Sequence, residues 1–289
     1  MNKITLNAYA KINLTLDIVG KRADGYHLIR SVMQSISLCD LVSVEKSNTM
    51  LISCDRDDVP CDERNIVYKI AKAFFEHTKI DGAVKIDIQK RIPSQAGLGG
   101  GSADGAATLL ALNKIFKTNL SQTTLCEIAK KVGADIPFCL IGGTLLAEGI
   151  GEKLTPLTSL CNSYIVVAKP NFGIDTKVAY STFDNLKETP DFATDILIKA
   201  LGGNVDDVAP KLNNMFEVCL NNEKIEAVKL RILSEGAKGA CMSGSGSAVF
   251  GMFDNLNRAQ NALEEMKKLG IFAQIVTPVS QGVEILEEV

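Results

Sequence analysis

Residues 93–102 read Pro-Ser-Gln-Ala-Gly-Leu-Gly-Gly-Gly-Ser, and this glycine-rich stretch joins a predicted strand to a predicted helix. Before it, Val84, Ile86 and Ile88 alternate with polar residues, which is the period of a strand. After it, an alanine-rich segment over 103–116 predicts a helix. Glycines let a ligand approach the backbone closely, and the unpaired N–H groups at the start of the helix face the same space. The stretch therefore predicts an anion site.

Other interpretations of this loop remain open. It is not a Walker loop, because no Gly-Lys-Ser/Thr follows, and it departs from the spacing G-x-G-x-x-G. A mobile glycine linker is the alternative without function. Ser102 could be the N-cap of the helix, a role compatible with contacting phosphate or Mg²⁺. We expect Asp104, in the first helical turn, to interact favourably with the helix dipole and not to bind phosphate, which it would repel.

The opening of the chain predicts a strand, because apolar and polar residues alternate from Ala8 to Ile18. Lys11 and Asn13 fall on its polar face, about 7 Å apart. A lysine in such a strand loses hydration unless an anion meets it. A phosphate, or a carboxylate such as that of Asp135, could be the anion that meets Lys11.

Asp135 itself has two interpretations. It lies in the stretch Gly133-Ala-Asp-Ile-Pro137, where Pro137 suits the first turn of a helix. Its carboxylate could simply help to cap that helix. Alternatively, it pairs with Lys11 beside a bound phosphate.

Two further stretches carry weaker signals. Gly239-Ala-Cys-Met-Ser-Gly-Ser-Gly-Ser247 predicts a tight hairpin, and its Gly-Ser-Gly could also form a small anion nest. Tyr26 and His27 follow the turn at Asp24-Gly25. They could cover a core edge and complete the turn, or they could recognise a nucleobase by stacking and hydrogen bonds.

The order of predicted elements indicates an α+β protein with two domains. Strands are expected at 29–38 and 41–46, and helices at 65–77 and after Ser121. Beyond Pro156 the order is β-α-β-β-α-β, the ferredoxin-like arrangement, if the additional helices are insertions. We therefore expect an N-terminal domain at 1–157, a C-terminal domain at 158–289 and a substrate cleft between them.

Composition excludes several classes. The 289 residues carry a net charge of -3, so no basic surface for nucleic acid or an anionic membrane is expected. No apolar run approaches the roughly 20 residues that span a bilayer. The eight cysteines form no C-x-x-C pair and only two histidines are present, which disfavours both a zinc site and a cysteine hydrolase. Scattered cysteines are typical of a reducing compartment, so we expect a cytoplasmic protein.

Taken together, three of these stretches resemble the GHMP kinases, the superfamily of galactokinase, homoserine kinase and mevalonate kinase, over nearly the whole chain. They are Ala8-Tyr-Ala-Lys-Ile-Asn13, the loop at 93–102 and the stretch at 239–247. Arg22-Ala-Asp-Gly-Tyr-His27 and residues 133–143, followed by Glu148-Gly-Ile-Gly-Glu152, resemble the branch that acts on 4-diphosphocytidyl-2-C-methyl-D-erythritol. The resemblance implies a ribosomal-protein-like ATP-binding domain followed by a ferredoxin-like domain.

The resemblance also implies roles for particular residues. Lys11 and Asp135 match the catalytic pair. The positions that match ATP-binding residues are Asn65, Pro93, Ala96, Gly97, Leu98, Gly99, Gly100, Gly101, Ser102 and Ala103. The positions that match substrate-binding residues are Asn13, Tyr26, His27, Asp135, Thr176, Tyr180, Gly244 and Ser245. Mg²⁺ is expected on the phosphates, with Ser102 as a weak ligand. Ser94-Gln95 departs from the family, which usually has small apolar residues there.

The function that the resemblance implies is transfer of the γ-phosphoryl group of ATP to the 2-hydroxyl of 4-diphosphocytidyl-2-C-methyl-D-erythritol. That reaction gives the 2-phosphate and ADP and belongs to non-mevalonate isoprenoid biosynthesis. The alternatives are another small-molecule kinase of the superfamily, of the homoserine or mevalonate type, and a nucleotide-binding module without catalysis. We expect a monomer or weak homodimer with no nucleic-acid or membrane partner.

Overall fold

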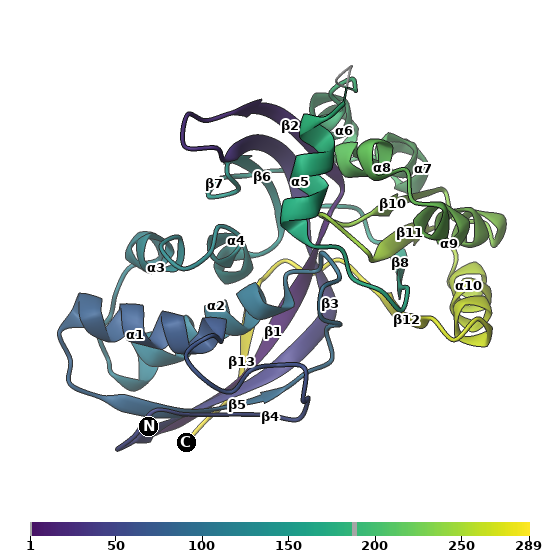
Figure 1. The fold of residues 1–289 in the computed structure, drawn as a ribbon. Coiled ribbons are helices and arrows are strands. Elements are labelled where there is room, and N and C mark those ends of the chain that lie inside the picture. Colours follow the sequence, from purple (N-terminus) through teal and green to yellow (C-terminus); the bar gives the residue numbers. More distant parts are fainter. Residues whose placement is uncertain (1, 187–189) are drawn as a thin grey trace.

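The computed structural model describes residues 2–186 and 190–289, and in these residues the strands form two sheets (Figure 1). The larger sheet has the order β13-β1-β3-β2-β9, with β5 and β6 also paired to β3, β4 to β5, and β7 to β6. Its strands are β1 (Lys3–Asn13), β2 (Thr15–Lys21), β3 (His27–Ser47), β4 (Leu51–Cys54), β5 (Ala83–Gln89), β6 (Thr144–Gly149), β7 (Lys153–Pro156), β9 (Asn213–Asn214) and β13 (Val283–Glu288).

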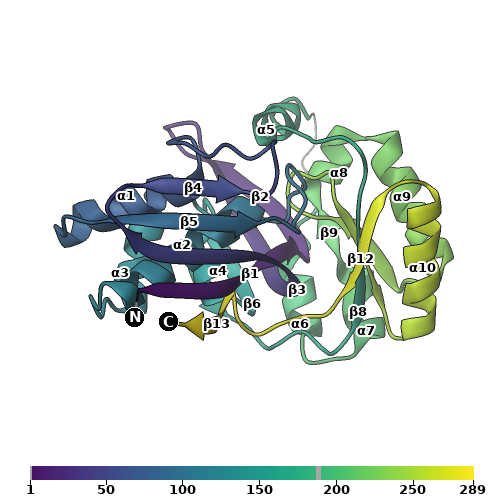
Figure 2. The same ribbon diagram turned by 90° about the horizontal axis from the view of Figure 1, so that it is seen from below.

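Four helices cover one face of this sheet, as Figure 2 shows from below. They are α1 (Ile66–Thr78), α2 (Gly100–Ile115), α3 (Gln122–Ala129) and α4 (Ile136–Ile141). Helix α1 buries Val67, Ile70 and Phe74, a helical spacing that turns one stripe toward the core. The side chain of Asn65 accepts the N–H of Val67 and caps this helix. Residue 65 is thereby held at the edge of the glycine loop.

The smaller sheet is antiparallel with the order β10-β11-β8-β12, and its strands are β8 (Tyr164–Lys169), β10 (Gly239–Met242), β11 (Val249–Phe253) and β12 (Phe272–Val276). Helices α9 (Glu223–Ser234) and α10 (Leu256–Lys268) cover its outer face (Figure 2). The remaining helices are α5 (Thr176–Asp184), α6 (Thr194–Ala200), α7 (Val205–Val208), a 3₁₀ turn at Ala209–Lys211 and α8 (Met215–Leu220). The α+β class and the ferredoxin-like order are confirmed.

Two strands from the C-terminal half of the chain join the larger sheet. Strand β13 pairs antiparallel with β1, so the C-terminus returns to the larger sheet beside the N-terminus (Figure 1). Strand β9 pairs in parallel with β2. The division at 157/158 stays a prediction, and the pairings of β13 and β9 connect the segments on its two sides.

Three local predictions are wrong. The strands expected at 29–38 and 41–46 are one continuous strand, β3. Ser102 is not an N-cap, because α2 already begins at Gly100, with Gly99 as its N-cap. Asp104 lies beyond the first turn and is buried. The early start of α2 has a reason in tertiary packing. A Cβ at Gly100 would lie 3.0 Å from Ile92 Cγ2, so the first turn of the helix needs glycine where it packs against the segment that enters the loop.

Candidate active site

Two cavities meet at the glycine loop. One, of about 570 Å³, lies between β1, the β2–β3 turn and α5. The other, of about 370 Å³, is lined by residues 92–102 and by Asn65. Gly97 and Gly99 line both. Ligands in the two cavities would therefore approach each other at these two glycines.

The loop is held in place by close backbone contacts. A Cβ on Gly97 would lie 2.0 Å from Ser243 O, and one on Gly99 would lie 3.0 Å from Lys11 Cγ. Both glycines have φ above +70°, a conformation that other residues rarely adopt. Ser243 Oγ donates to Gly97 O at 2.9 Å, and Lys11 N donates to Leu98 O at 3.0 Å. The predicted hairpin at 239–247 is confirmed, and it packs directly against the loop.

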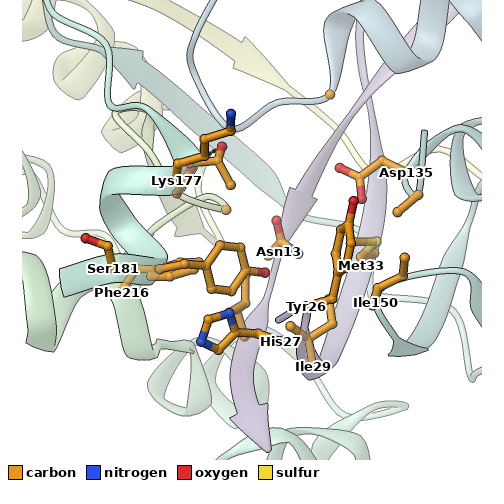
Figure 3. Close-up of a pocket in the computed structure, with 18 of the residues that line it drawn as sticks. Asn13, Tyr26, His27, Ile29, Met33, Asp135, Ile150, Lys177, Ser181 and Phe216 are labelled. Atoms are coloured by element: carbon orange, nitrogen blue, oxygen red, sulfur yellow. Dashed lines mark hydrogen bonds between the residues drawn. The ribbon is translucent and has the colours of Figure 1, made fainter. Parts of the chain in front are cut away.

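Lys11 and Asp135 lie side by side at this meeting point. The Nζ of Lys11 is 3.6 Å from Asp135 Oδ2 and donates to Asn13 Oδ1 at 2.8 Å. The Lys11 side chain is 5% exposed, whereas that of Asp135 is 34% exposed and faces the larger cavity (Figure 3). Asp135 makes no capping hydrogen bond to α4, so helix capping does not account for its carboxylate. A buried cation thus stands beside an accessible carboxylate that can accept a proton.

Aromatic rings line the same cavity. The ring of His27 stacks on that of Tyr180, with centroids 4.5 Å apart and planes 13° apart. His27 Nε2 is 2.7 Å from Asp184 Oδ1. Burial raises the pKa of Tyr180 to about 12, so its phenol stays neutral. Tyr26 is 60% exposed and lies on the Asp135 side, opposite His27 and Phe216 (Figure 3). A planar base bound in this part of the larger cavity would have the ring of Tyr26 on one side and that of His27 on the other.

The structure brings together the residues expected to bind each ligand. Thr176 Oγ1 and Ser245 Oγ are 2.9 Å apart and join α5 to the hairpin. The expected substrate-binding residues all line the larger cavity, namely Asn13, Tyr26, His27, Asp135, Thr176, Tyr180, Gly244 and Ser245. The expected ATP-binding residues line the smaller one, except Ala103, which is buried in α2. Their roles in binding stay predictions.

The sequence reasoning missed three charged residues of the larger cavity, Lys21, Lys177 and Asp184. Lys21 pairs with Asp184 at 2.6 Å. Within residues 2–186 and 190–289, Lys177 makes no ion pair, and its side chain stands at the rim of the cavity (Figure 3). The sequence reasoning also missed Lys90, which lines the smaller cavity. A lysine directly before the glycine loop was the available signal for Lys90, but nothing in the sequence showed which way α5 would turn Lys177.

The residues present do not form a metal cage. Among the described residues, no group of three or more His, Cys, Asp or Glu could hold a metal ion. Ser102 lies in the first turn of α2 and lines the smaller cavity. This donor set fits a Mg²⁺ ion carried mainly by phosphates. In the part of the chain that the structure describes, no helix has the length and apolarity needed to cross a membrane.

Comparisons with known proteins identify the family of this chain. The N-terminal domain of the GHMP kinases matches residues 65–143, and their C-terminal domain matches residues 197–271. A 4-diphosphocytidyl-2-C-methyl-D-erythritol kinase of Clostridium botulinum (strain Eklund 17B / Type B) is 46% identical over 269 residues, 92% of this chain and 96% of that protein. The enzyme of that name from Clostridium acetobutylicum is 42% identical with the same coverage.

Solved structures show the same fold. A crystal structure of 4-(cytidine 5'-diphospho)-2C-methyl-D-erythritol kinase superimposes with a TM-score of 0.80 at 32% identity, covering 95% of this chain and 99% of that one. Homoserine kinase from Cytophaga hutchinsonii has a TM-score of 0.77 at 20% identity and 99% and 98% coverage, which shows a shared fold alone. The chain belongs to the GHMP kinases and, within them, to the 4-diphosphocytidyl-2-C-methyl-D-erythritol kinase family.

Proposed function

We propose that this small-molecule kinase transfers the γ-phosphoryl group of ATP to the 2-hydroxyl of 4-diphosphocytidyl-2-C-methyl-D-erythritol. The products are the 2-phosphate and ADP, as in non-mevalonate isoprenoid precursor biosynthesis. The observation that carries the proposal is the Lys11–Asp135 pair, 3.6 Å apart where the two cavities meet. The names of the relatives supply the identity of the acceptor.

Asp135 is the proposed proton acceptor. The substrate hydroxyl oxygen forms a bond to the γ-phosphorus, the bond from that phosphorus to ADP breaks, and the hydroxyl proton passes to Asp135. Lys11 offsets negative charge between acceptor and phosphoryl group. Phosphoryl transfer has a loose transition state, so orientation and electrostatics matter more than base strength.

The glycine loop is the proposed triphosphate site. Helix α2 starts directly from the loop, so its first N–H groups and the positive end of its dipole face the smaller cavity. Ser102 and the phosphates would hold Mg²⁺, which neutralises phosphate charge when bound. Asn65, at the edge of the same cavity, is the proposed contact near adenine.

The aromatic rings favour a cytidine substrate over a small aliphatic one. Stacking of a base on an aromatic ring contributes about 1–3 kcal/mol. Tyr26 on one side, and His27 with Tyr180 on the other, provide ring faces that homoserine and mevalonate cannot use. We therefore place the cytosine in this part of the cavity.

The deciding experiment measures ADP release from Mg-ATP with the cytidine substrate, its uridine and adenosine analogues, homoserine and mevalonate. Turnover is expected with the cytidine substrate and at least about tenfold less with every other acceptor, a margin of about 1.4 kcal/mol. Preferential phosphorylation of homoserine or mevalonate would favour another kinase of the superfamily. Nucleotide binding without ADP release on any acceptor would favour a non-catalytic module.

All eight cysteines are free thiols, which supports the proposed cytoplasmic location. The monomeric or weakly dimeric state stays a prediction.

A further inference from the structure

Three buried ionisable side chains lie beneath the glycine loop, and each comes from a different segment of the chain. Asp40 belongs to β3, Lys90 directly follows β5, and Asp104 belongs to α2. All three are at most 4% exposed. Lys90 Nζ donates to Asp104 Oδ2 at 2.7 Å and to Asp40 Oδ2. We refer to these residues as the Asp40–Lys90–Asp104 cluster.

The cluster fixes the segment that enters the loop. Asp40 Oδ1 accepts the N–H groups of Arg91 at 2.6 Å and Ile92 at 2.8 Å. The N–H of Lys90 donates to Asp55 Oδ1 at 2.9 Å. Three successive backbone amides are therefore held by carboxylates, and the loop begins at the next residue.

The same cluster reaches the helix that leaves the loop. A Cβ on Gly100 would lie 3.2 Å from Lys90 Nζ, so the ammonium group sits directly against the first residue of α2. Its partner Asp104 is four residues further along this helix. Lys90 and Asp104 both line the smaller cavity. One ammonium group thus links the two ends of the loop.

Stability alone gives little reason for such a cluster, because well-packed apolar residues often replace a buried ion pair without loss. Two carboxylates share one ammonium group, and Asp104 Oδ1 has no hydrogen-bond partner. Burial raises the pKa of the Asp104 carboxyl, Lys90 opposes this rise and Asp40 adds to it. An amide in place of this carboxyl has the same shape and still offers an oxygen that can accept the Lys90 hydrogen bond.

We propose that the Asp40–Lys90–Asp104 cluster is a positioning device for the phosphate loop. By tying the entering segment to the start of α2, it presets the backbone amides of residues 97–102 for a triphosphate. The inference rests on the proposed function only in taking ATP as the ligand of the smaller cavity.

The test compares Asp104→Leu with Asp104→Asn. Leucine breaks the link to α2 but leaves Lys90 paired with Asp40, so no net buried charge is created. Asparagine still offers an oxygen to Lys90. Phe74→Leu is the control for general destabilisation, because Phe74 belongs to α1, is fully buried in the core and lines neither cavity. Calorimetry gives Kd for ADP and for β,γ-imido-ATP, and turnover at saturating ATP gives KM for the cytidine substrate.

We expect Asp104→Leu to raise the nucleotide Kd about tenfold, the effect of losing one hydrogen bond to a charged group. KM for the cytidine substrate should stay within about twofold, because the larger cavity does not contact Asp104. Asp104→Asn should recover most of the nucleotide affinity. Phe74→Leu should lower Tm without changing the nucleotide Kd.

Three results would overturn the proposal. In the first, Asp104→Leu binds nucleotide as tightly as wild type. In the second, Asp104→Asn binds nucleotide as weakly as the leucine variant although its oxygen can still accept from Lys90, so that the link to Lys90 does not set the affinity. In the third, Phe74→Leu weakens binding as much at an equal loss of Tm. Should the leucine variant not fold, Asp104→Ala takes its place with the same criteria. Nucleotide binding needs no acceptor, so a wild type that binds nucleotide but phosphorylates nothing would contradict the proposed function alone.

Discussion

Replacing Asp135 with Asn should lower the rate of phosphoryl transfer while leaving the stability of the fold nearly unchanged. The Asp135 side chain is 34% exposed, makes no capping bond to α4, and lies 3.6 Å from the ammonium of Lys11. An ion pair with one partner this exposed contributes about 0–1 kcal/mol. For a chain of this size, that loss lowers Tm by at most about 4 °C. Lys11 also keeps its hydrogen bond to Asn13. The variant is therefore expected to stay folded.

The loss of activity should be far larger. Asparagine has the same shape as aspartate but cannot take the hydroxyl proton. Removing a general base typically lowers kcat about 10²–10⁴-fold, which raises the barrier by about 2.7–5.4 kcal/mol. KM for ATP should stay within about threefold, because Asp135 lines the larger cavity and not the smaller one.

A coupled assay of ADP release with both substrates saturating gives kcat, and scanning calorimetry gives Tm. The matched control is Asp195→Asn, which replaces another exposed, ion-paired carboxylate that lines neither cavity. A kcat for Asp135→Asn within about threefold of wild type would refute the role of base. A fall in Tm well beyond that of the control would instead restore a structural role for Asp135.

Three further predictions follow from the geometry of the two cavities. Gly97→Ala should nearly abolish ATP binding and lower Tm, because the new Cβ would lie 2.0 Å from Ser243 O. Its control, Gly270→Ala, is also at positive φ but has nothing within 4 Å of the new Cβ, so it should lower Tm only; equal effects of the two variants on ATP binding would contradict this reasoning. Tyr26→Ala should raise KM for the cytidine substrate by about fivefold or more without changing Tm, since the ring is 60% exposed; an unchanged KM would exclude stacking. Lys177 lines the larger cavity, and we expect its ammonium group to contact the diphosphate of the cytidine substrate. Lys177→Ala should therefore raise the same KM by about threefold to tenfold at low salt and less at high salt, while KM for ATP stays constant; an effect independent of salt would argue against this contact.

The local patterns of the sequence were enough for several of the elements and for the family. The alternation around Val84 placed β5, the spacing of Val67, Ile70 and Phe74 placed α1, and Ser121 correctly capped α3. These signals are short-range, because a helix or strand must turn its apolar residues to one side whatever it packs against. The glycine loop predicts an anion site for the same reason, since backbone freedom is a property of the residues themselves.

Long-range packing decided the rest. Nothing local indicates that Gly100 begins a helix, because glycine is a poor helix former, and only the contact with Ile92 and Lys90 requires it there. The pairing of β13 with β1 joins the two ends of the chain. The ion pair between Lys90 and Asp104 likewise depends on how the end of β5 packs against α2.

By itself, the sequence determined the α+β class, the ferredoxin-like order after Pro156, the candidate phosphate loop and the candidate pair of Lys11 and Asp135. Only the tertiary structure decided that this ammonium and this carboxylate stand 3.6 Å apart beside Gly99, and which residues hold the loop from below. Residue types and spacing fix backbone conformation over a few residues. Distances between side chains that are far apart in the chain are set by the packing of whole sheets and helices.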